Sequence, residues 1–406
     1  MAGLKDMYRT ALQGNKPVQV IIKIRYADGT NQEIVYRPSQ ITERYGTNPH
    51  QLFRLMSGEN PRFNISQMKK GKGGFSLTNV EDAYWASEFL KYCDQPACAV
   101  MKHENPCGGA AVSGDVFDAF MKAWWVDWIA AFGSVVCFNQ PITRELATEL
   151  VEKGSDSKPK YFIEAIAAPD FETGAISELE KRDDLRALKY HGLKDVPRYR
   201  EIMLGDSSII PGDAAGPIIK TMGDPGDLLS FEDRFLSRIQ TEDDFLVKEI
   251  IIDEKKVPVG VMTKTQPHRL QLTDLKYAWP AAYVLRSNAV AIVRDGVLIS
   301  PGTGQQDRVR AVRHAINRVR ELEQEAEKTP GLADFRSGIF AYSNLDGAVL
   351  ASEAFFPYRD SIDAISHTGI GVVAETGGSV RDPEVIAAAE GYGISLIFTG
   401  ERTFRH

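Results

Sequence analysis

Cysteine is scarce in this sequence and never occurs in a closely spaced pair. The 406 residues contain four cysteines, at Cys93, Cys98, Cys107 and Cys137, and none belongs to a Cys-x-x-Cys motif. A disulfide scaffold needs a much higher density of cysteines, so that class of protein is excluded. We expect the four thiols to be reduced.

Long apolar runs and an excess of positive charge are also missing. No uncharged apolar stretch approaches the roughly 18 residues of a membrane span, and Lys5 stands where a signal peptide would be apolar. These absences predict a cytoplasmic protein without a membrane partner. Lys and Arg number 48 against 55 Asp and Glu, a net charge of −7, so the chain repels polyanions and we expect no nucleic-acid partner.

The composition that is present indicates an ordinary folded chain. Hydrophobic residues make up 43% and charged residues 25%, which excludes a disordered or fibrous protein. A length of 406 residues predicts on the order of two or three domains. Near the N-terminus, β-branched residues at 18–25 and 32–36 flank the turn Asp28-Gly29, a pattern that predicts a β-hairpin.

Two later stretches alternate strand and helix patterns, which indicates an α/β fold. The first should contain a helix near 80–93, a strand at Ala97–Lys102, a turn at Gly108-Gly109, a helix near 115–131 and a strand at Ser134–Phe138. The second should contain strands at Asn288–Arg294, Gly338–Ser343 and Gly371–Ala374, a turn at Gly302–Gly304, and helices at Arg308–Lys328 and Pro383–Gly391. We therefore predict an N-terminal appendage at 1–40, α/β units at 41–204 and 248–406, and a linker at 205–247.

The first constellation that could carry chemistry is KHENPCGG at Lys102–Gly109. A zinc deaminase would need His-x-Glu and Pro-Cys-x-x-Cys here, but Glu104 follows His103 directly and Ala110 stands where the second cysteine belongs. No metal is therefore expected. The remaining interpretations are a metal-free acid–base site of Lys102 and His103, or a structural pair at the end of a strand.

Two further constellations are polar or aromatic. RYGTNPHQ at Arg44–Gln51 joins a guanidinium, a phenol and a turn, and by itself would be a polar loop. AFFPYRD at Ala354–Asp360 suits a heteroaromatic ring, unless its aromatic residues only pack in the core. The turn Gly377–Ser379 at the start of a helix should offer backbone N–H groups to a polar ligand. The end of the chain, Arg402–His406, is either part of this site or a frayed tail.

Eight motifs together resemble the transformylase domain of the bifunctional purine biosynthesis protein family, which formylates 5-aminoimidazole-4-carboxamide ribonucleotide (AICAR). The resemblance runs from about residue 41 to the last residue. In order, the motifs are RYGTNPHQ (Arg44–Gln51), KHENPCG (Lys102–Gly108), AFG (Ala131–Gly133), TKTQP (Thr263–Pro267), SNA (Ser287–Ala289), GTGQQDRV (Gly302–Val309), AFFPYRD (Ala354–Asp360) and FTGERTFRH (Phe398–His406).

The resemblance implies both a fold and a reaction. The fold would be two zinc-free cytidine-deaminase-like α/β/α units behind the N-terminal hairpin, in a homodimer with active sites at the subunit interface. The reaction would take the formyl group from 10-formyltetrahydrofolate to AICAR and give 5-formamidoimidazole-4-carboxamide ribonucleotide (FAICAR), the penultimate step of IMP biosynthesis. Only 43 residues precede Arg44, so we expect a stand-alone transformylase without IMP cyclohydrolase activity.

The same resemblance implies roles for individual residues. His103 would be the general base, and Lys102 and Asn288 would assist it and stabilise the oxyanion of the tetrahedral intermediate. The residues implied to bind AICAR are Arg44, Tyr45, His103, Gly133, Glu164, Asn288, Phe355 and Arg402. The residues implied to bind the folate are Arg308, Val309, Asp360, Ser379 and Val380, with Pro357 and Tyr358 as an apolar wall.

One position departs from the family and puts a structural monovalent cation in doubt. Glu353 stands where bifunctional relatives often have Asp, and the longer side chain argues against a structural monovalent cation there. Two other functions compete with the transformylase: a deaminase or hydrolase that keeps the fold, and a non-catalytic nucleotide sensor. Missing zinc ligands count against the first, and the presence of Lys102, His103 and Asn288 counts against the second. Asp360 and Ser379 favour folate as the formyl donor.

Overall fold

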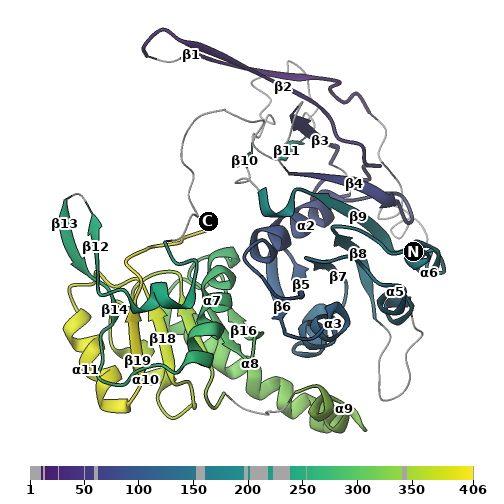
Figure 1. The fold of residues 1–406 in the computed structure, drawn as a ribbon. Coiled ribbons are helices and arrows are strands. Elements are labelled where there is room, and N and C mark those ends of the chain that lie inside the picture. The colour runs from purple at the N-terminus through teal and green to yellow at the C-terminus, as the bar shows by residue number, and fades with distance from the viewer. Residues whose placement is uncertain are drawn as a thin grey trace. The chain divides into compact units, whose positions relative to one another are not determined.

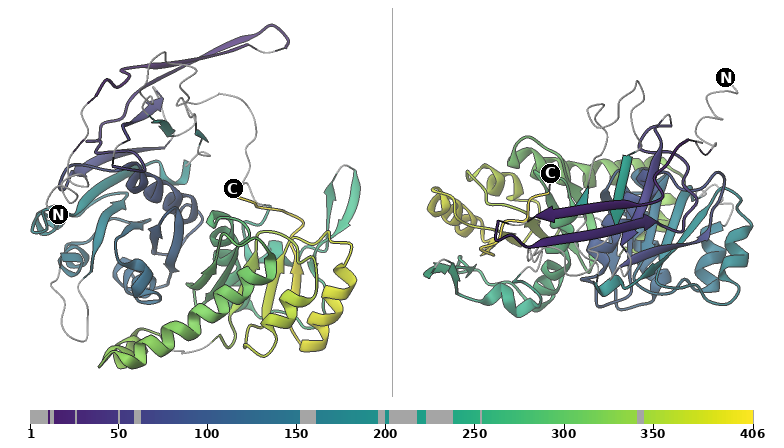
Figure 2. Two further views of the ribbon diagram at one scale, coloured as in Figure 1. Left: turned by 180° about the vertical axis from the view of Figure 1, so that it is seen from behind. Right: turned by 90° about the horizontal axis from the view of Figure 1, so that it is seen from above.

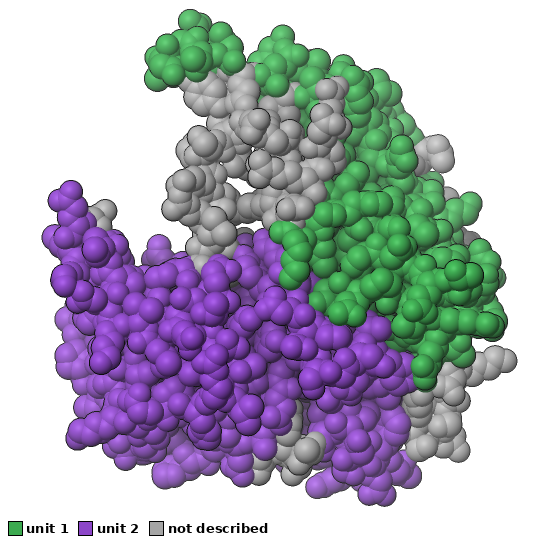
Figure 3. Space-filling view, in the orientation of Figure 1, with its two compact units in different colours: residues 1–87, 134–151, 163–233 green, residues 88–133, 152–162, 234–406 purple. Residues whose placement is uncertain are grey.

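The computed structural model describes residues 11, 14–25, 27–49, 51–58, 63–151, 161–195, 200–201, 218–222, 238–252, 254–340 and 345–405. The chain divides into two compact units, each built from separate stretches of sequence (Figure 3). Unit 1 contains residues 1–87, 134–151 and 163–233, and unit 2 contains residues 88–133, 152–162 and 234–406.

Unit 1 begins with the predicted hairpin. Strands β1 (Val20–Arg25) and β2 (Asn31–Pro38) pair antiparallel around the turn at Asp28-Gly29, where Thr30 N donates to Asp28 Oδ1 at 2.9 Å. The hairpin extends away from the rest of unit 1 (Figure 1, Figure 2). It belongs to a five-stranded sheet of order β1-β2-β3-β11-β10, with β3 at Phe53–Gly58, β10 at Arg200–Glu201 and β11 at Ile218–Met222.

The second sheet of unit 1 is mostly parallel. Strands β7 (Ser134–Phe138), β8 (Ile163–Ala168) and β9 (Arg186–His191) run parallel, and β4 (Asn64–Lys69) pairs antiparallel with β9. Every residue of β7 is buried, as expected for a parallel strand covered on both faces. The unit also contains α5 (Arg144–Val151), α6 (Ala175–Glu180) and the short 3₁₀ helix at Leu193–Asp195.

Unit 2 is built on one mixed sheet in the order β14-β19-β18-β17-β15-β16-β6-β5. Strands β17, β18 and β19 are parallel to one another and the other pairings are antiparallel. The strands are β5 (Ala97–Lys102), β6 (Asn105–Ala111), β14 (Gly260–Val261), β15 (Val290–Arg294), β16 (Val297–Gly302), β17 (Val349–Ser352), β18 (Val372–Glu375) and β19 (Ser395–Phe398).

Helices cover this sheet, and a separate hairpin stands out from it. Strands β12 (Glu249–Ile252) and β13 (Lys255–Pro258) pair only with each other and project from the body of unit 2 (Figure 1, Figure 3). The helices are α3 (Val116–Trp125), α4 (Trp128–Ala131), α7 (Arg269–Val284), α8 (Arg308–Lys328), α9 (Leu332–Ile339), α10 (Asp360–Ile365), α11 (Asp382–Tyr392) and a 3₁₀ helix at Glu242–Leu246.

The order of elements along the chain occurs twice. Helix α2 (Leu77–Leu90) is followed by β5-β6-α3-α4-β7-α5-β8-α6-β9, and α7 is followed by β15-β16-α8-α9-β17-α10-β18-α11-β19. Each series therefore has a helix, a strand hairpin, two helices and then three strands alternating with two helices. The α/β class is confirmed, while the domain boundaries at 41–204 and 248–406 stay predictions.

Glycines explain the clearest error in the sequence prediction. The expected turn at Gly108-Gly109 lies inside strand β6, which the sequence analysis missed. A Cβ atom on Gly108 would lie 2.0 Å from the carbonyl oxygen of Ala123, and one on Gly302 would lie 2.0 Å from that of Ala311. Glycine is needed at these two positions because helices α3 and α8 approach the second strand of each hairpin closely.

Other expectations are corrected in detail or fall outside the description. The predicted helix near 115–131 is broken, because Asp127 caps α4 by accepting a hydrogen bond from Ala130 N at 2.9 Å. The predicted strand at Gly338–Ser343 begins inside α9, and its residues 341–343 lie outside the described residues. So do 205–217 and 223–237 of the predicted linker. None of the described helices is both long and apolar enough to cross a membrane.

Candidate functional site

A tight hairpin turn presents the predicted base. Lys102 ends β5 and Asn105 begins β6, so His103 and Glu104 alone form the turn, with φ angles of 56° and 63°. Two positive φ angles define a type I′ turn, which favours Gly, Asn and Asp because other residues cost about 1–2 kcal/mol each. The His103 side chain is exposed. The backbone thus holds an imidazole at the tip of a hairpin in an unfavourable conformation.

Two arginines fix the second residue of this turn. Glu104 Oε2 lies 2.7 Å from a terminal nitrogen of Arg405 and 2.8 Å from one of Arg286. Arg405 also donates to the Glu104 carbonyl oxygen at 2.6 Å and to the carbonyl oxygen of Val284. Burial lowers the pKa of Arg405 to about 10, and the Glu104 carboxylate opposes this shift. Because Arg405 is 6% exposed, the chain is packed rather than frayed at this position.

The residue after the turn connects it to the segment that carries Asn288. Asn105 Oδ1 accepts hydrogen bonds at 3.0 Å from Arg286 N and from Thr303 Oγ1. Asn288 Nδ2 donates to the Gln305 carbonyl oxygen at 2.8 Å, and the peptide bond that precedes Asn288 is cis. The structure therefore joins the segments that carry His103 and Asn288, and their catalytic roles stay a prediction of the family resemblance.

Lys102 lies beside another predicted residue. Its Nζ donates to the Phe132 carbonyl oxygen at 2.7 Å, next to Gly133 in the chain. Gly133 has a φ of 80° and its N donates to the Phe162 carbonyl oxygen at 2.6 Å. The rings of Phe132 and Phe162 stack with centroids 4.7 Å apart. Lys102, His103, Asn288 and Gly133 thus belong to one hydrogen-bonded region of unit 2.

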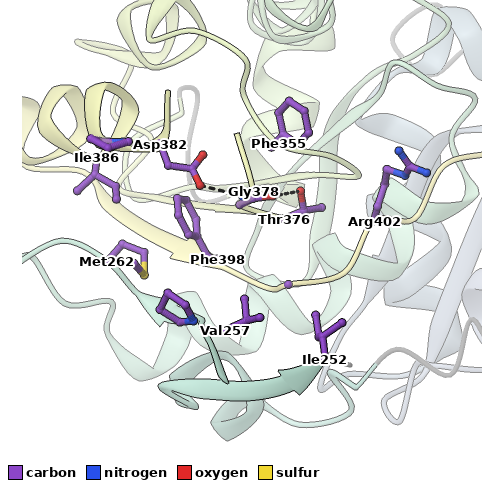
Figure 4. A pocket seen from close by; sticks show the side chains of 14 residues that line it. Ile252, Val257, Met262, Phe355, Thr376, Gly378, Asp382, Ile386, Phe398 and Arg402 are labelled. Carbon is purple, nitrogen blue, oxygen red and sulfur yellow. Dashed lines mark hydrogen bonds between the residues drawn. The ribbon is translucent and has the colours of Figure 1, made fainter. Parts of the chain in front are cut away.

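A pocket of about 580 Å³ in unit 2 contains two residues of the predicted nucleotide set, Phe355 and Arg402 (Figure 4). Arg402 is exposed and its guanidinium lies 4.7 Å from the Phe404 ring centroid. Seven other residues that line the pocket are apolar, and together they are called its apolar wall. They are Ile252, Val257, Pro258, Met262, Pro383, Ile386 and Phe398.

The glycine turn beside this pocket does not offer its N–H groups as expected. Gly377 N donates to Glu375 Oε2 at 3.3 Å, and Gly378 N and Ser379 N donate to the Asp382 carboxylate at 2.8 and 3.0 Å (Figure 4). These donors are used by carboxylates of the chain itself, because an acidic residue in the first turn of a helix caps the preceding backbone. The expectation that they are open to a ligand is corrected.

The predicted folate residues differ in accessibility. Val380 is 99% exposed, while Asp360 at the start of α10 and Ser379, three residues before α11, are partly exposed. Arg308 is 5% exposed, and Val309 follows it in the first turn of α8. Arg308 therefore reaches solvent much less than the other members of this set.

Arg308 forms a buried ion pair with Glu353. Its Nη1 contacts Glu353 Oε2 and donates to the Ala289 carbonyl oxygen at 2.8 Å. Glu353 Oε1 accepts hydrogen bonds from Ser287 Oγ at 2.5 Å and Ala289 N at 2.9 Å. Since a guanidinium already neutralises this carboxylate and both oxygens are engaged, these residues do not fit a monovalent cation at Glu353.

The other predicted nucleotide residues lie in unit 1. Arg44 and Tyr45 are buried, and the Arg44 guanidinium lies 4.5 Å from the Tyr45 ring centroid. Glu164 accepts a hydrogen bond from Asn79 at 3.0 Å. Burial lowers the pKa of Arg186 to about 10, with Arg44 adding to the shift and Glu164 opposing it. Arg44, Glu164 and Arg186 therefore share one charged cluster.

Several site residues were missed in the sequence. Glu104 belongs to the motif KHENPCG and Arg405 to the motif FTGERTFRH, but the sequence analysis assigned roles only to their neighbours. Arg405 and Glu104 are 301 positions apart, so no local pattern reveals their contact. The apolar wall of the pocket, from Ile252 to Phe398, had no signal beyond ordinary hydrophobicity. Across the described part of the chain, no group of three or more His, Cys, Asp or Glu side chains could hold a metal ion.

Comparison with known proteins identifies the family. The profile described as AICARFT/IMPCHase bienzyme matches residues 19–207 and 230–318. The bifunctional purine biosynthesis protein PurH of Caldicellulosiruptor saccharolyticus is 33% identical over 368 residues, covering 89% of this chain and 58% of that protein. PurH of Aquifex aeolicus is 34% identical over 368 residues, covering 89% and 59%. The chain belongs to the AICARFT/IMPCHase bienzyme family, and spans less than two thirds of these relatives.

Proposed function

We propose that this protein transfers the formyl group of 10-formyltetrahydrofolate to the 5-amino group of AICAR, giving FAICAR and tetrahydrofolate in purine biosynthesis. The relatives are named as purine biosynthesis proteins, and the family name includes the transformylase. The observation that carries the proposal is the junction of the His103-Glu104 turn with the Asn288 segment through Arg286 and Asn105. It joins the segments that carry the His103 imidazole and the Asn288 amide, which supports the roles proposed for them.

The chemistry requires both groups. The AICAR amine is conjugated with the ring and its carboxamide, so it is a weak nucleophile and must lose a proton as it attacks the formyl carbon. In the proposed mechanism His103 accepts that proton. The oxyanion of the tetrahedral intermediate is stabilised by Lys102 and Asn288. When the intermediate collapses, the carbon–nitrogen bond to the folate breaks and the folate nitrogen takes up the proton.

Within the described part of the chain, the hydrogen bonds of Lys102 and Asn288 leave donors for this step. An ammonium group has three N–H donors, and Lys102 uses one on the Phe132 carbonyl oxygen. The amide of Asn288 has two, and one is used on the Gln305 carbonyl oxygen. Both side chains are thus held in place by the protein and keep N–H groups for an oxyanion.

We assign the ligands as the family resemblance implies. The residues proposed to bind AICAR are Arg44, Tyr45, His103, Gly133, Glu164, Asn288, Phe355 and Arg402. Those proposed to bind the folate are Arg308, Val309, Asp360, Ser379 and Val380. Arg402 supports the first set because its exposed guanidinium opens onto an apolar pocket, which suits an anion with a flat ring.

The finer expectations stand on the same resemblance. We propose two zinc-free cytidine-deaminase-like α/β/α units, a homodimer and a cytoplasmic location. The repeated order of elements supports the first of these. Sedimentation of the purified protein would test the dimer directly, with a monomer at micromolar concentration counting against it.

One assay tests the function. Purified protein would be incubated with AICAR and either 10-formyltetrahydrofolate or formate plus ATP, and FAICAR would be measured by chromatography. We expect FAICAR only with the folate donor, and the same rate after exhaustive chelation. Release of ammonia from AICAR without the formyl donor would instead indicate a deaminase. Tight AICAR binding with no turnover would indicate a nucleotide sensor.

A further inference from the structure

A buried glutamate connects two walls of the unit 2 pocket. Glu375 ends β18 and is 0% exposed. Its Oε2 accepts hydrogen bonds from Phe356 N at 2.9 Å and from Gly377 N at 3.3 Å. Phe355, which precedes Phe356, and Gly377 both line the pocket, and Figure 4 labels Phe355 and the neighbouring Gly378. One carboxyl oxygen therefore holds both segments.

The environment of Glu375 disfavours a negative charge. Its second oxygen, Oε1, is buried and has no hydrogen-bond partner within the described part of the structure. The charged groups that act on it are Asp382 of α11 and Arg308 of α8, and Arg308 is already paired with Glu353, which follows β17. An unpaired buried carboxylate is costly, so the neutral acid is favoured. Burial raises the pKa of Glu375 to about 8.

We propose that Glu375 is a positioning residue that acts as a neutral carboxylic acid and holds the Phe355 and Gly377 walls of the pocket in the arrangement that binds the nucleotide. The inference rests on the proposed function, since it takes AICAR as the ligand of this pocket. A neutral acid can still accept both backbone hydrogen bonds through its carbonyl oxygen. A carboxylate at the same place would also repel an anionic substrate.

Three variants distinguish an effect of the hydrogen-bond acceptor at Glu375 from an effect of its charge. Glu375→Gln keeps a carbonyl oxygen and stays neutral at every pH, whereas Glu375→Ala removes the acceptor. Glu384→Gln is the matched control, because Glu384 lies in the first turn of α11 and is not among the residues that line the pocket. The KM for AICAR and kcat would be measured from about pH 6 to about pH 9.

The expected results differ clearly among the variants. Glu375→Ala should raise the KM for AICAR roughly fivefold to tenfold with a smaller change in kcat, since a lost acceptor affects binding more than chemistry. Glu375→Gln should keep the KM within about twofold of wild type near pH 7, and should abolish the increase in KM that wild type shows above about pH 8. A wild-type KM in Glu375→Ala, or equal losses in the Ala and Gln variants, would overturn the proposal.

A second readout does not depend on activity. Amide hydrogen exchange of peptides covering Phe356 and Gly377 should be faster in Glu375→Ala and unchanged in Glu375→Gln. If wild type forms no FAICAR, the proposed function fails, and this measurement still decides whether Glu375 holds the two walls. Unchanged exchange in Glu375→Ala would overturn the positioning role even if FAICAR is formed.

Discussion

The two repeats of this chain carry equivalent hairpins whose turns are built differently. In the first repeat His103 and Glu104 connect β5 to β6, and in the second Asp295 and Gly296 connect β15 to β16. The φ angles are 56° and 63° in the first turn and 51° and 72° in the second, so both have the same type I′ backbone. Asp-Gly is a favoured pair for this turn, whereas His-Glu is not.

The supports of the two turns also differ. In the second repeat Asp274 of α7 accepts hydrogen bonds from Asp295 N at 3.0 Å and Gly296 N at 2.7 Å, so one buried carboxylate caps the turn. In the first repeat the turn is held by ion pairs of Glu104, and the His103 side chain is exposed. Residues that disfavour a backbone conformation persist there when their chemistry is needed. The difference supports the proposed function, in which the first turn is functional and the second is structural.

The largest effect should come from removing the imidazole. His103→Ala should lower kcat roughly 10²- to 10⁴-fold, the usual contribution of a positioned general base, with little change in the KM for AICAR. Asp295→Asn at the equivalent turn is the control and should leave kcat unchanged, because Asn also tolerates a positive φ. Steady-state kinetics of both variants decides the matter. Wild-type turnover by His103→Ala would remove the functional distinction between the turns.

The next effect concerns the support of the first turn. Arg405→Ala should lower the free energy of unfolding by about 2–3 kcal/mol, because it leaves Glu104 and the Val284 carbonyl oxygen without a buried donor. Arg286 is the more exposed partner of Glu104, because the Arg286 side chain is 44% exposed. Arg286→Ala should therefore lower the free energy of unfolding by less than about 1 kcal/mol. Denaturant unfolding measures both. Equal losses would show that burial of Arg405 adds nothing to this support.

Much of both repeats was predictable because their signals are local. Strands β5 and β7 and helix α8 occur at the predicted boundaries, since continuous apolar runs and a 3.6-residue period specify them directly. Strands β6 and β16 were missed because their glycines resemble turn signals, although Gly108 and Gly302 serve close helix packing. That role depends on where α3 and α8 pack against the sheet, and local sequence patterns do not reveal this packing.

The candidate site was also predictable only in part. Family motifs supplied the identities of His103 and Asn288, but not the hydrogen bonds of Arg286 that join their segments. The motif around Gly377 predicted open N–H donors, and the structure shows them bound to Glu375 and Asp382. Sequence patterns thus predicted which residue types are present, whereas competition between internal partners and ligands depends on tertiary contacts.

A smaller effect should appear when the first turn is given a residue that suits its backbone. His103→Asn should raise the free energy of unfolding by about 0.5–1 kcal/mol, because Asn adopts a positive φ more readily than His. The same variant should lose activity as His103→Ala does, since an amide cannot accept the proton. Denaturant unfolding and kinetics would be compared in one preparation. A destabilised His103→Asn would show that the turn is not strained by its residue.

The last prediction concerns the cap of the second turn, and it is a change of stability with pH. Burial raises the pKa of Asp274 to about 6, against an ordinary value of 3.8, and the two backbone N–H groups oppose that shift. The native state therefore binds more protons than the unfolded state between these values, so this group's contribution to stability is present at low pH and is lost as pH rises through about 6. Unfolding free energies of wild type and Asp274→Asn would be measured from about pH 4 to about pH 8. The unfolding free energy of wild type minus that of the variant should fall as pH rises to about 6 and then stay level. If this difference instead rises with pH, the two N–H groups, rather than burial, control the ionisation of Asp274.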